Sequence, residues 1–272
     1  MIKIGCLQPE IHNLKSECYE EIETLFDSFI SENETCDIVC LPERWVPLTK
    51  NIAEVTQQER GEDYQFICNL AKKYNTSIIS GAIWETRSDQ IKPKITSYFI
   101  GNDGREIGRQ DKLHLYAYER EYFEPGNEVK IFSNEKVSFA ILICFDMAFF
   151  ETPRIAVENG AQILFSPTQI REEGMANWEI YLKARALENR VPVAACNTLG
   201  QFFKRKFTGK SKIISFEDKH ISPSKLNVLE ASENSSGYIY AQIDLSFSDK
   251  IRKLRFDEIL KKEMIKVSTV TF

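Results

Sequence analysis

Residues 137–146 read VSFAILICFD, and this stretch decides the fold of the chain. Its first seven residues are mostly apolar and favour β-structure, which predicts a buried strand over residues 137–143. The next clear element is a helix that begins near Thr152-Pro153, a good N-cap and first-turn pair. Cys144 therefore lies at the carboxyl end of a strand, where open α/β sheets carry their binding and reacting groups.

Strand and helix patterns alternate on both sides of this stretch. Apolar residues at helical spacing predict helices over residues 18–29, 64–74 and 178–189. Short β-favouring runs predict strands over 2–7, 38–41, 77–83, 161–165, 191–196, 212–216 and 237–244. The turn Gly101-Asn102-Asp103-Gly104 joins two further strands in a hairpin. No linker divides the chain, so we expect a single α/β domain over residues 1–272, with mixed sheets covered by helices.

Composition argues against several classes of protein. Hydrophobic residues make up 43% of the chain and charged residues 28%, with a net charge of -5, which is ordinary for a globular protein. No basic stripe appears, so we expect no nucleic-acid partner. No apolar segment reaches the length of a membrane span, so we expect no membrane partner. The first residues read as a strand and not as a signal peptide, so we expect a cytoplasmic location.

The chain has seven cysteines, an odd number, and most of them fall in apolar patterns typical of buried reduced thiols. Cys36 and Cys40 are four residues apart, which raises the question of a metal site. The three histidines are not paired with these cysteines at the usual zinc spacing. We therefore expect no metal ligands and no cofactor.

Two charged residues follow other strand ends and complete a possible site with Cys144. Glu43 lies just past the strand that Pro42 stops, and Lys112 follows the second strand of the hairpin. Taken singly, these are most often a loop charge, a surface lysine and a buried thiol. Together they are able to perform acyl transfer: the lysine favours the thiolate and stabilises an oxyanion, and the glutamate moves the proton. The N–H of Phe145 is placed to be a second oxyanion donor.

These segments, in this order, resemble the nitrilase superfamily of carbon–nitrogen hydrolases. The resemblance spans roughly residues 1–245 and rests on short motifs that are weak singly: Leu41-Pro42-Glu43, Lys112-Leu113-His114-Leu115, Glu119 with Tyr122-Phe123-Glu124-Pro125-Gly126, Ile143-Cys144-Phe145-Asp146, Glu151 with Arg154, Gly160-Ala161, Ser166-Pro167, Arg185-Ala186-Leu187-Glu188-Asn189 and Gly209-Lys210-Ser211.

The resemblance implies a four-layer α-β-β-α sandwich and a Glu-Lys-Cys triad carried by Glu43, Lys112 and Cys144. It also implies a second carboxylate, which spacing assigns to Glu119, with Glu121 as the competing candidate. That carboxylate would hold Lys112 and orient the substrate or the water. Protomers of the family usually pair through the helix after the cysteine and through C-terminal extensions, so we expect a homodimer or higher homo-oligomer.

The residues after the nucleophile bear on the substrate. Cys144-Phe145-Asp146-Met147 resembles the amidase and carbamoylase branches, which implies hydrolysis of a small linear amide or N-carbamoyl compound with release of ammonia. An aliphatic nitrile is the alternative, because it needs no different nucleophile. A Cys-His enzyme with His114 as base and a catalytically silent interaction protein on the same fold are two further hypotheses.

The substrate pocket is harder to predict. Trp45, Arg171, Phe149 and Phe150 lie next to the motif segments and are candidates to line it, with Arg171 able to pair with a substrate carboxylate. The C-terminal extension, residues 245–272, combines basic and apolar residues. It reads either as a solvated charged helix or as a segment that docks on a partner protomer.

Overall fold

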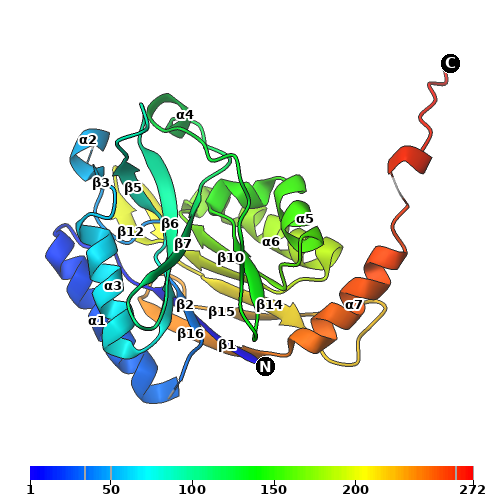
Figure 1. The fold of residues 1–272 in the computed structure, drawn as a ribbon, viewed down its shortest axis with the longest axis horizontal. Helices are drawn as coiled ribbons and strands as arrows, with labels where there is room; N and C mark the ends of the chain where they lie inside the picture. The colour runs from blue at the N-terminus through cyan, green and yellow to red at the C-terminus, as the bar shows by residue number, and fades with distance from the viewer. Residues whose placement is uncertain (34, 50, 261, 272) are drawn as a thin grey trace.

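Two β-sheets pack face to face, and helices cover their outer faces (Figure 1). The computed structural model describes residues 1–33, 35–49, 51–260 and 262–271. The first sheet runs in the order β16 (Gly237–Ile243), β1 (Ile2–Gln8), β2 (Ile38–Cys40), β4 (Ser77–Ile79), β6 (Lys94–Ile100), β5 (Ile83–Thr86) and β3 (Gln57–Gln58), and β7 (Glu106–Asp111) also pairs with β6.

The second sheet runs in the order β15 (Leu226–Glu230), β14 (Lys212–Phe216), β11 (Val193–Asn197), β10 (Ile163–Thr168), β9 (Ser138–Ile141) and β8 (Ile131–Ser133). A separate hairpin is formed by β12 (Leu199–Phe202) and β13 (Arg205–Thr208). In both sheets parallel pairs lie at the centre, as β1 with β2 and β9 with β10 with β11 show. The carboxyl ends of these strands carry the site described below.

Helices form the two outer layers. Helices α1 (Lys15–Asn33) and α3 (Glu62–Tyr74) pack on the first sheet through residues such as Phe26 and Ile67. Helices α5 (Glu151–Glu158) and α6 (Met175–Asn189) pack on the second sheet through residues such as Ala156 and Leu182. The expected four-layer α-β-β-α sandwich is therefore confirmed.

Strand β9 explains why the run before Cys144 is apolar at nearly every position. Phe139 and Ile141 pack between the two sheets, whereas Ala140 and Leu142 pack under α5 and α6. Side chains alternate across a strand, so a strand covered on both faces needs apolar residues at consecutive positions. The burial of both faces, and not an amphipathic pattern, is what this stretch of sequence encodes.

The strand expected over residues 77–83 is interrupted. β4 ends at Ile79 and β5 begins at Ile83, and between them Gly81 adopts a φ of +75°. A side chain at Gly81 would place its Cβ 2.1 Å from the carbonyl oxygen of Pro42. Glycine is needed there because the backbone turns in a left-handed conformation against a neighbouring loop. The prediction of one continuous strand was wrong for this reason.

Two predicted helix starts are also displaced. Helix α5 begins at Glu151, so Thr152 and Pro153 lie in its first turn, and the preceding Phe150 makes no side-chain capping bond. Helix α6 begins at Met175 and not near Trp178, because the short turn η2 (Glu172–Gly174) leads directly into it. Helix ends are poorly specified by local pattern alone, since the apolar face starts only where the helix meets the sheet.

The C-terminal part of the chain leaves the sandwich. Helix α7 (Leu245–Asp257) is anchored by Leu245 and Ile251, which are buried. Beyond it the chain, with the short turn η3 (Lys262–Met264), extends away from the body of the molecule (Figure 1). In the part of the chain that the structure describes, no helix has the length and apolarity that a membrane crossing requires.

Candidate active site

Three strand ends meet at one cavity of about 690 Å³ that Glu43, Lys112, Glu119 and Cys144 all line. Glu43 follows β2, Lys112 follows β7 directly, and Cys144 opens the short 3₁₀ helix η1 (Cys144–Ala148) after β9. The ammonium of Lys112 donates to Oε1 of Glu43 at 2.7 Å and to the Glu119 carboxylate at 2.9 Å. Residues 69 positions apart in the chain are thus in direct contact.

The loop that carries Glu43 is fastened on both sides. Its N–H donates to the carbonyl of Thr168 at 3.1 Å, and its carbonyl accepts from the N–H of Ala82 at 3.1 Å. Thr168 belongs to the second sheet and Ala82 follows the Gly81 turn of the first sheet. Glu43 therefore lies on a backbone that bridges the two sheets, which limits the movement of its carboxylate.

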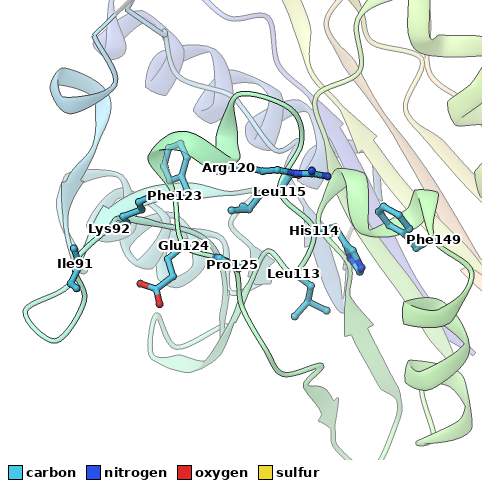
Figure 2. Close-up of a pocket in the computed structure, with 10 residues that line it drawn as sticks. All are labelled: Ile91, Lys92, Leu113, His114, Leu115, Arg120, Phe123, Glu124, Pro125 and Phe149. Carbon is cyan, nitrogen blue, oxygen red and sulfur yellow. The ribbon is translucent and has the colours of Figure 1, made fainter.

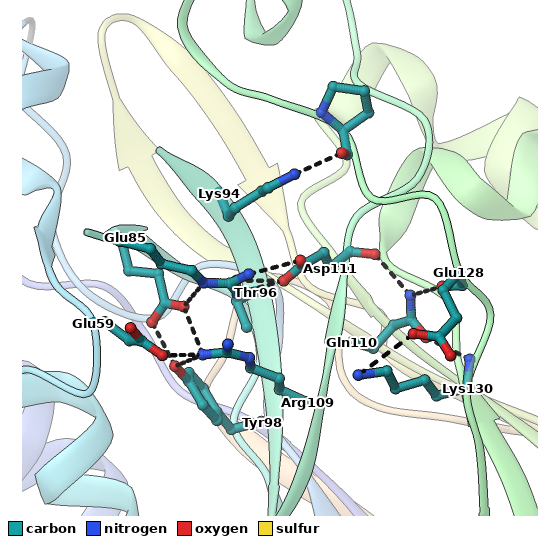
Figure 3. Close-up of polar contacts among 12 residues, drawn as sticks. Glu59, Glu85, Lys94, Thr96, Tyr98, Arg109, Gln110, Asp111, Glu128 and Lys130 are labelled. Atoms are coloured by element: carbon teal, nitrogen blue, oxygen red, sulfur yellow. Dashed lines mark hydrogen bonds and ion pairs between the residues drawn. The ribbon is translucent and has the colours of Figure 1, made fainter. Parts of the chain in front are cut away.

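Lys112 is positioned by the end of β7. Its N–H donates to the carbonyl of Ile95 at 2.9 Å, and its carbonyl accepts from Gly126 N–H at 2.8 Å. The preceding residue, Asp111, accepts from both terminal nitrogens of Arg87 at 2.6 and 2.9 Å and from Thr96 at 2.9 Å (Figure 3). These bonds fix the backbone from which the lysine side chain extends.

The same network continues away from the cavity. Glu85 is fully buried and accepts from Arg87 at 2.9 Å and from the hydroxyl of Tyr98 at 2.6 Å (Figure 3). Arg109 forms an ion pair with Glu59, which directly follows the edge strand β3. Buried charges are tolerated when they are paired and hydrogen-bonded, and here the pairs join the strands that end beside Lys112.

Cys144 has a backbone φ of +48°, in the left-handed region that non-glycine residues rarely adopt. Such strain persists only where surrounding contacts impose it. The contacts come from Asp146, whose Oδ2 accepts from the N–H of Ile143 at 2.9 Å and whose Oδ1 accepts from the N–H of His114 at 2.7 Å. One fully buried carboxylate therefore ties the cysteine turn to the loop that follows Lys112.

The structure separates the two candidates for the second carboxylate. Glu119 is buried, contacts Lys112, and accepts from the N–H of Tyr116 at 2.8 Å through its Oε2. Glu121 is exposed, and its backbone carbonyl accepts from Lys92 at 2.9 Å. Only Glu119 lines the cavity of Cys144 among these two.

Burial and charge shift the protonation of three groups in the site. Burial alone would lower the pKa of Lys112, but the facing Glu43 and Glu119 raise that pKa well above its ordinary value. Burial raises the pKa of Glu119, with Lys112 opposing and Glu43 adding to the rise. Burial and the Glu43 carboxylate raise the pKa of the Cys144 thiol well above its ordinary value, and Lys112 lowers it by less. Burial and the facing carboxylate thus both favour the neutral thiol form of Cys144.

Of the expected substrate contacts, Phe145 and Arg171 line the cavity. The guanidinium of Arg171 lies 3.0 Å from Oε1 of Glu173 and donates to the hydroxyl of Tyr116 at 3.2 Å. The N–H of Phe145 lies in the first turn of η1, where backbone N–H groups have no acceptor within the helix.

Trp45 does not reach the cavity, so its expected substrate contact is corrected. Its indole is almost fully buried under the α1 and α3 layer, and Nε1 donates to the carbonyl of Ser80 at 2.7 Å. The ring lies 6.0 Å from that of Tyr19 and 5.9 Å from that of Phe66. The backbone after Cys40 is irregular and not a strand, so Glu43 and Trp45, although only two positions apart, enter different surroundings.

His114 and Phe149 line a neighbouring cavity of about 610 Å³ (Figure 2). Their rings stack at 4.2 Å, and Nδ1 of His114 lies 3.0 Å from Oδ1 of Asp146. Phe150 is exposed and lines neither of these two cavities. The histidine thus faces Asp146 and Phe149 and lines a different cavity from Glu43.

Sequence reasoning missed two features of the site. The N–H of Gln169, just after β10, faces the sulfur of Cys144 and lowers its pKa. The β12–β13 hairpin brings Phe202, Phe203 and Phe207 to the cavity wall. A run with two adjacent phenylalanines and a third four residues later was the available signal, but its turn residues, Phe203 and Lys204, are not ones that predict a hairpin.

Within the described residues no three or more His, Cys, Asp or Glu side chains are grouped as ligands of an ion. All seven cysteines are free thiols.

Comparison with known proteins agrees with the fold. The family model described as carbon-nitrogen hydrolase matches residues 3–253. The chain is 28% identical over 258 residues to a probable nitrilase of Schizosaccharomyces pombe, covering 92% of this chain and 91% of the relative. It is 29% identical over 265 residues to 2-oxoglutaramate amidase of Bacillus subtilis, covering 95% and 97%.

Among solved structures, a carbon–nitrogen hydrolase from Helicobacter pylori G27 superposes with a TM-score of 0.83 at 21% identity, covering 95% of each chain. The four-layer fold and the family match together define an α/β enzyme that cleaves carbon–nitrogen bonds other than peptide bonds. The chain belongs to the carbon–nitrogen hydrolase family.

Proposed function

We propose that the protein hydrolyses a small linear amide or N-carbamoyl compound through a thioester on Cys144, with Glu43, Lys112 and Cys144 as the catalytic triad. The observation that supports this most strongly is the buried Lys112 ammonium, held 2.7 Å from Glu43 and 2.9 Å from Glu119 at the cavity that Cys144 also lines. A buried charge cluster of this kind at a strand end is typical of a functional site.

In the first half-reaction, the sulfur of Cys144 attacks the carbonyl carbon of the amide. Because the pKa of the thiol is raised, its proton must leave during the attack, and Glu43 accepts it. The ammonium of Lys112 and the N–H of Phe145 stabilise the oxyanion of the tetrahedral intermediate. When the intermediate collapses, the C–N bond breaks, Glu43 returns the proton to the nitrogen, and ammonia leaves.

In the second half-reaction, a water molecule attacks the thioester carbon. Glu43 takes a proton from the water, the C–S bond breaks, and the sulfur recovers the proton as the acid leaves. Glu119 keeps Lys112 in place through both halves by its 2.9 Å contact and orients the substrate amide or the water. Phe145 and Arg171 line the cavity and contact the rest of the substrate.

The candidate substrates differ in the kind of carbon–nitrogen bond that the thiol attacks. The relative from Bacillus subtilis is named for an amide substrate, which supports amide hydrolysis, and the relative from Schizosaccharomyces pombe is named a probable nitrilase. A nitrile is therefore the second candidate, because the same thiol is able to attack a nitrile carbon. A silent interaction protein is disfavoured because all four candidate residues line one cavity.

The test is ammonia release from primary amides, N-carbamoyl amino acids and aliphatic nitriles, with Cys144→Ala as the blank. Cys68→Ala is the matched control, because Cys68 is the other partly exposed thiol and lies outside the cavity. We expect release by the wild type and by Cys68→Ala, and a mass increase on the Cys144 peptide after rapid quenching. Equal release by Cys144→Ala would refute the triad.

We infer that the enzyme forms a homodimer to which the C-terminal extension contributes. Past α7 the chain exposes a series of apolar residues, among them Leu260, Ile265 and Val267, on a segment that extends from its own protomer (Figure 1). Exposed apolar surface of this kind is typical of a protein interface. A second protomer is the occupant that the resemblance to the family favours.

A cytoplasmic location is the remaining part of the proposal. Seven free thiols are typical of proteins in reducing compartments. Fluorescence microscopy of a C-terminally tagged protein in its own cells is the direct measurement, and an extracellular signal would contradict it.

A further inference from the structure

The cavity of Cys144 has a strongly aromatic wall. Ten of the side chains that line it are aromatic, and they come from β5, from the loop after Lys112 and the short helix α4 (Glu119–Tyr122), from η1, from α6 and from the β12–β13 hairpin. Five of them, Tyr116, Tyr118, Tyr122, Tyr181 and Phe203, are still between 37% and 43% exposed. Clustered exposed aromatic surface in a cavity is typical of a binding site for an apolar group.

The hairpin tip makes the clearest contribution to this wall. Phe203 and Lys204, at its two-residue turn, have φ values of +51° and +61°. A bulky residue rarely adopts this conformation, because its Cβ approaches the following carbonyl. Phe202 stacks on Phe207 with ring centroids 4.5 Å apart, which holds the base of the hairpin. The turn therefore keeps Phe203 at the cavity while exposing its ring.

The charges in the cavity are largely matched by each other. Lys112 lies between Glu43 and Glu119, so the reacting end presents two carboxyl groups and one ammonium. Arg171 is paired with Glu173 at 3.0 Å. A substrate carboxylate would have to displace one of these partners, at the cost of leaving it unpaired in a partly enclosed site.

Arg205 also lines the cavity, on the hairpin. Its side chain is exposed, and ion pairs at exposed positions contribute little, roughly 0–1 kcal/mol. The volume of about 690 Å³ lies within the range, about 300–1000 Å³, of cavities that bury drug-sized ligands. The cavity volume, the aromatic wall and the paired charges all disfavour a short substrate that is polar at both ends.

We propose that the part of the substrate remote from the reacting carbonyl is an uncharged arylalkyl or alkyl group that the aromatic wall covers. This inference rests on the proposed amide hydrolysis and names its substrate class. The reaction is R–CO–NH₂ + H₂O → R–COOH + NH₃, with R apolar. The chain then differs in specificity from an enzyme that takes the monoamide of a dicarboxylic acid.

The test compares kcat/KM for 4-phenylbutanamide, butanamide and glutaramate. We expect 4-phenylbutanamide to exceed glutaramate by at least about tenfold, since apolar contacts of this size discriminate by about 10–200-fold. Phe203→Ala should lower kcat/KM for 4-phenylbutanamide about tenfold and change that for butanamide less than about threefold. The matched control is Phe150→Ala, which removes an aromatic ring that is 49% exposed but outside this cavity.

A second measurement keeps the inference separate from the proposed function. Each compound is tested for protection of Cys144 from iodoacetamide, followed by mass spectrometry of the cysteine peptide, so that binding is read without turnover. Protection by 4-phenylbutanamide without ammonia release would support the apolar site and refute amide hydrolysis. A tenfold preference for glutaramate in either assay, no protection by 4-phenylbutanamide, or equal effects of Phe203→Ala on all three amides would overturn the inference.

Discussion

Replacing Asp146 by asparagine should weaken the link between the turn of Cys144, the proposed nucleophile, and the loop that follows Lys112. The carboxylate is fully buried and accepts from Ile143 N–H at 2.9 Å and from His114 N–H at 2.7 Å, one through each oxygen. An asparagine of the same shape has one oxygen and one NH₂ group. Whichever way it turns, the NH₂ faces a backbone N–H, and a donor then meets a donor.

The magnitude follows from that count. One charge-assisted hydrogen bond is lost, worth roughly 1.5–3 kcal/mol, and a buried donor is left unpaired at a cost of roughly 1–3 kcal/mol. The free energy of unfolding should fall by about 3–5 kcal/mol, which most domains survive. The turnover should fall further than stability suggests, because Cys144 at φ +48° loses the contact that imposes this conformation. A displacement of about 1 Å costs about 100-fold in kcat.

The assay combines ammonia release, urea unfolding and hydrogen exchange. In the variant, peptides covering residues 112–116 and 142–147 should lose protection, whereas the β10 peptide, residues 161–168, should keep it. The matched control is His114→Ala, which removes the imidazole but leaves the backbone N–H of residue 114 bonded to Asp146. We expect kcat for this control to stay within about tenfold of the wild type.

Two results would refute this reasoning. An Asp146→Asn enzyme with kcat within threefold of the wild type would show that Asp146 does not position the nucleophile. A His114→Ala enzyme as inactive as Asp146→Asn would instead assign the effect to the imidazole and revive a Cys-His mechanism.

Three further perturbations test the rest of the site. Lys112→Met should lower kcat by about 100-fold or more, because an oxyanion donor is lost, whereas near-normal ammonia release would remove the lysine from the triad. Arg87→Met should lower the free energy of unfolding at pH 7 by about 3–5 kcal/mol in urea titrations, because it leaves carboxylates without their guanidinium. Burial alone would raise the pKa of Asp111, but Arg87 outweighs it and holds this pKa below its usual 3.8. The stabilisation is therefore present above pH 3.8 and is lost as the pH falls through the lower pKa of the folded state. The Arg87→Met variant should lose this acid dependence of stability. Truncation after Glu258 should convert a dimer to a monomer in light scattering, and an unchanged mass would exclude the extension from the interface.

Several elements follow from local pattern because that pattern reports burial. β14 runs over Lys212–Phe216 as predicted, and β1 and β16 differ from their predicted ranges by one residue each. Strand β9 is covered on both faces, so its continuous apolar run identified it. The interrupted strand at Gly81 could not be predicted in the same way, since the cause is the Pro42 carbonyl of another segment.

The candidate site divides along the same line. By itself, the sequence determined which residues follow strand ends, and its motif order indicated a family, hence Glu43, Lys112 and Cys144. Only the tertiary structure showed that Glu119, and not Glu121, contacts Lys112 in the cavity, and that Trp45 lies in the core. It also showed that burial and Glu43 raise the pKa of Cys144, and that a hairpin with three phenylalanines lines the cavity. Protonation and shape at a site depend on groups that are distant in the chain, and side-chain periodicity carries no record of which distant groups meet.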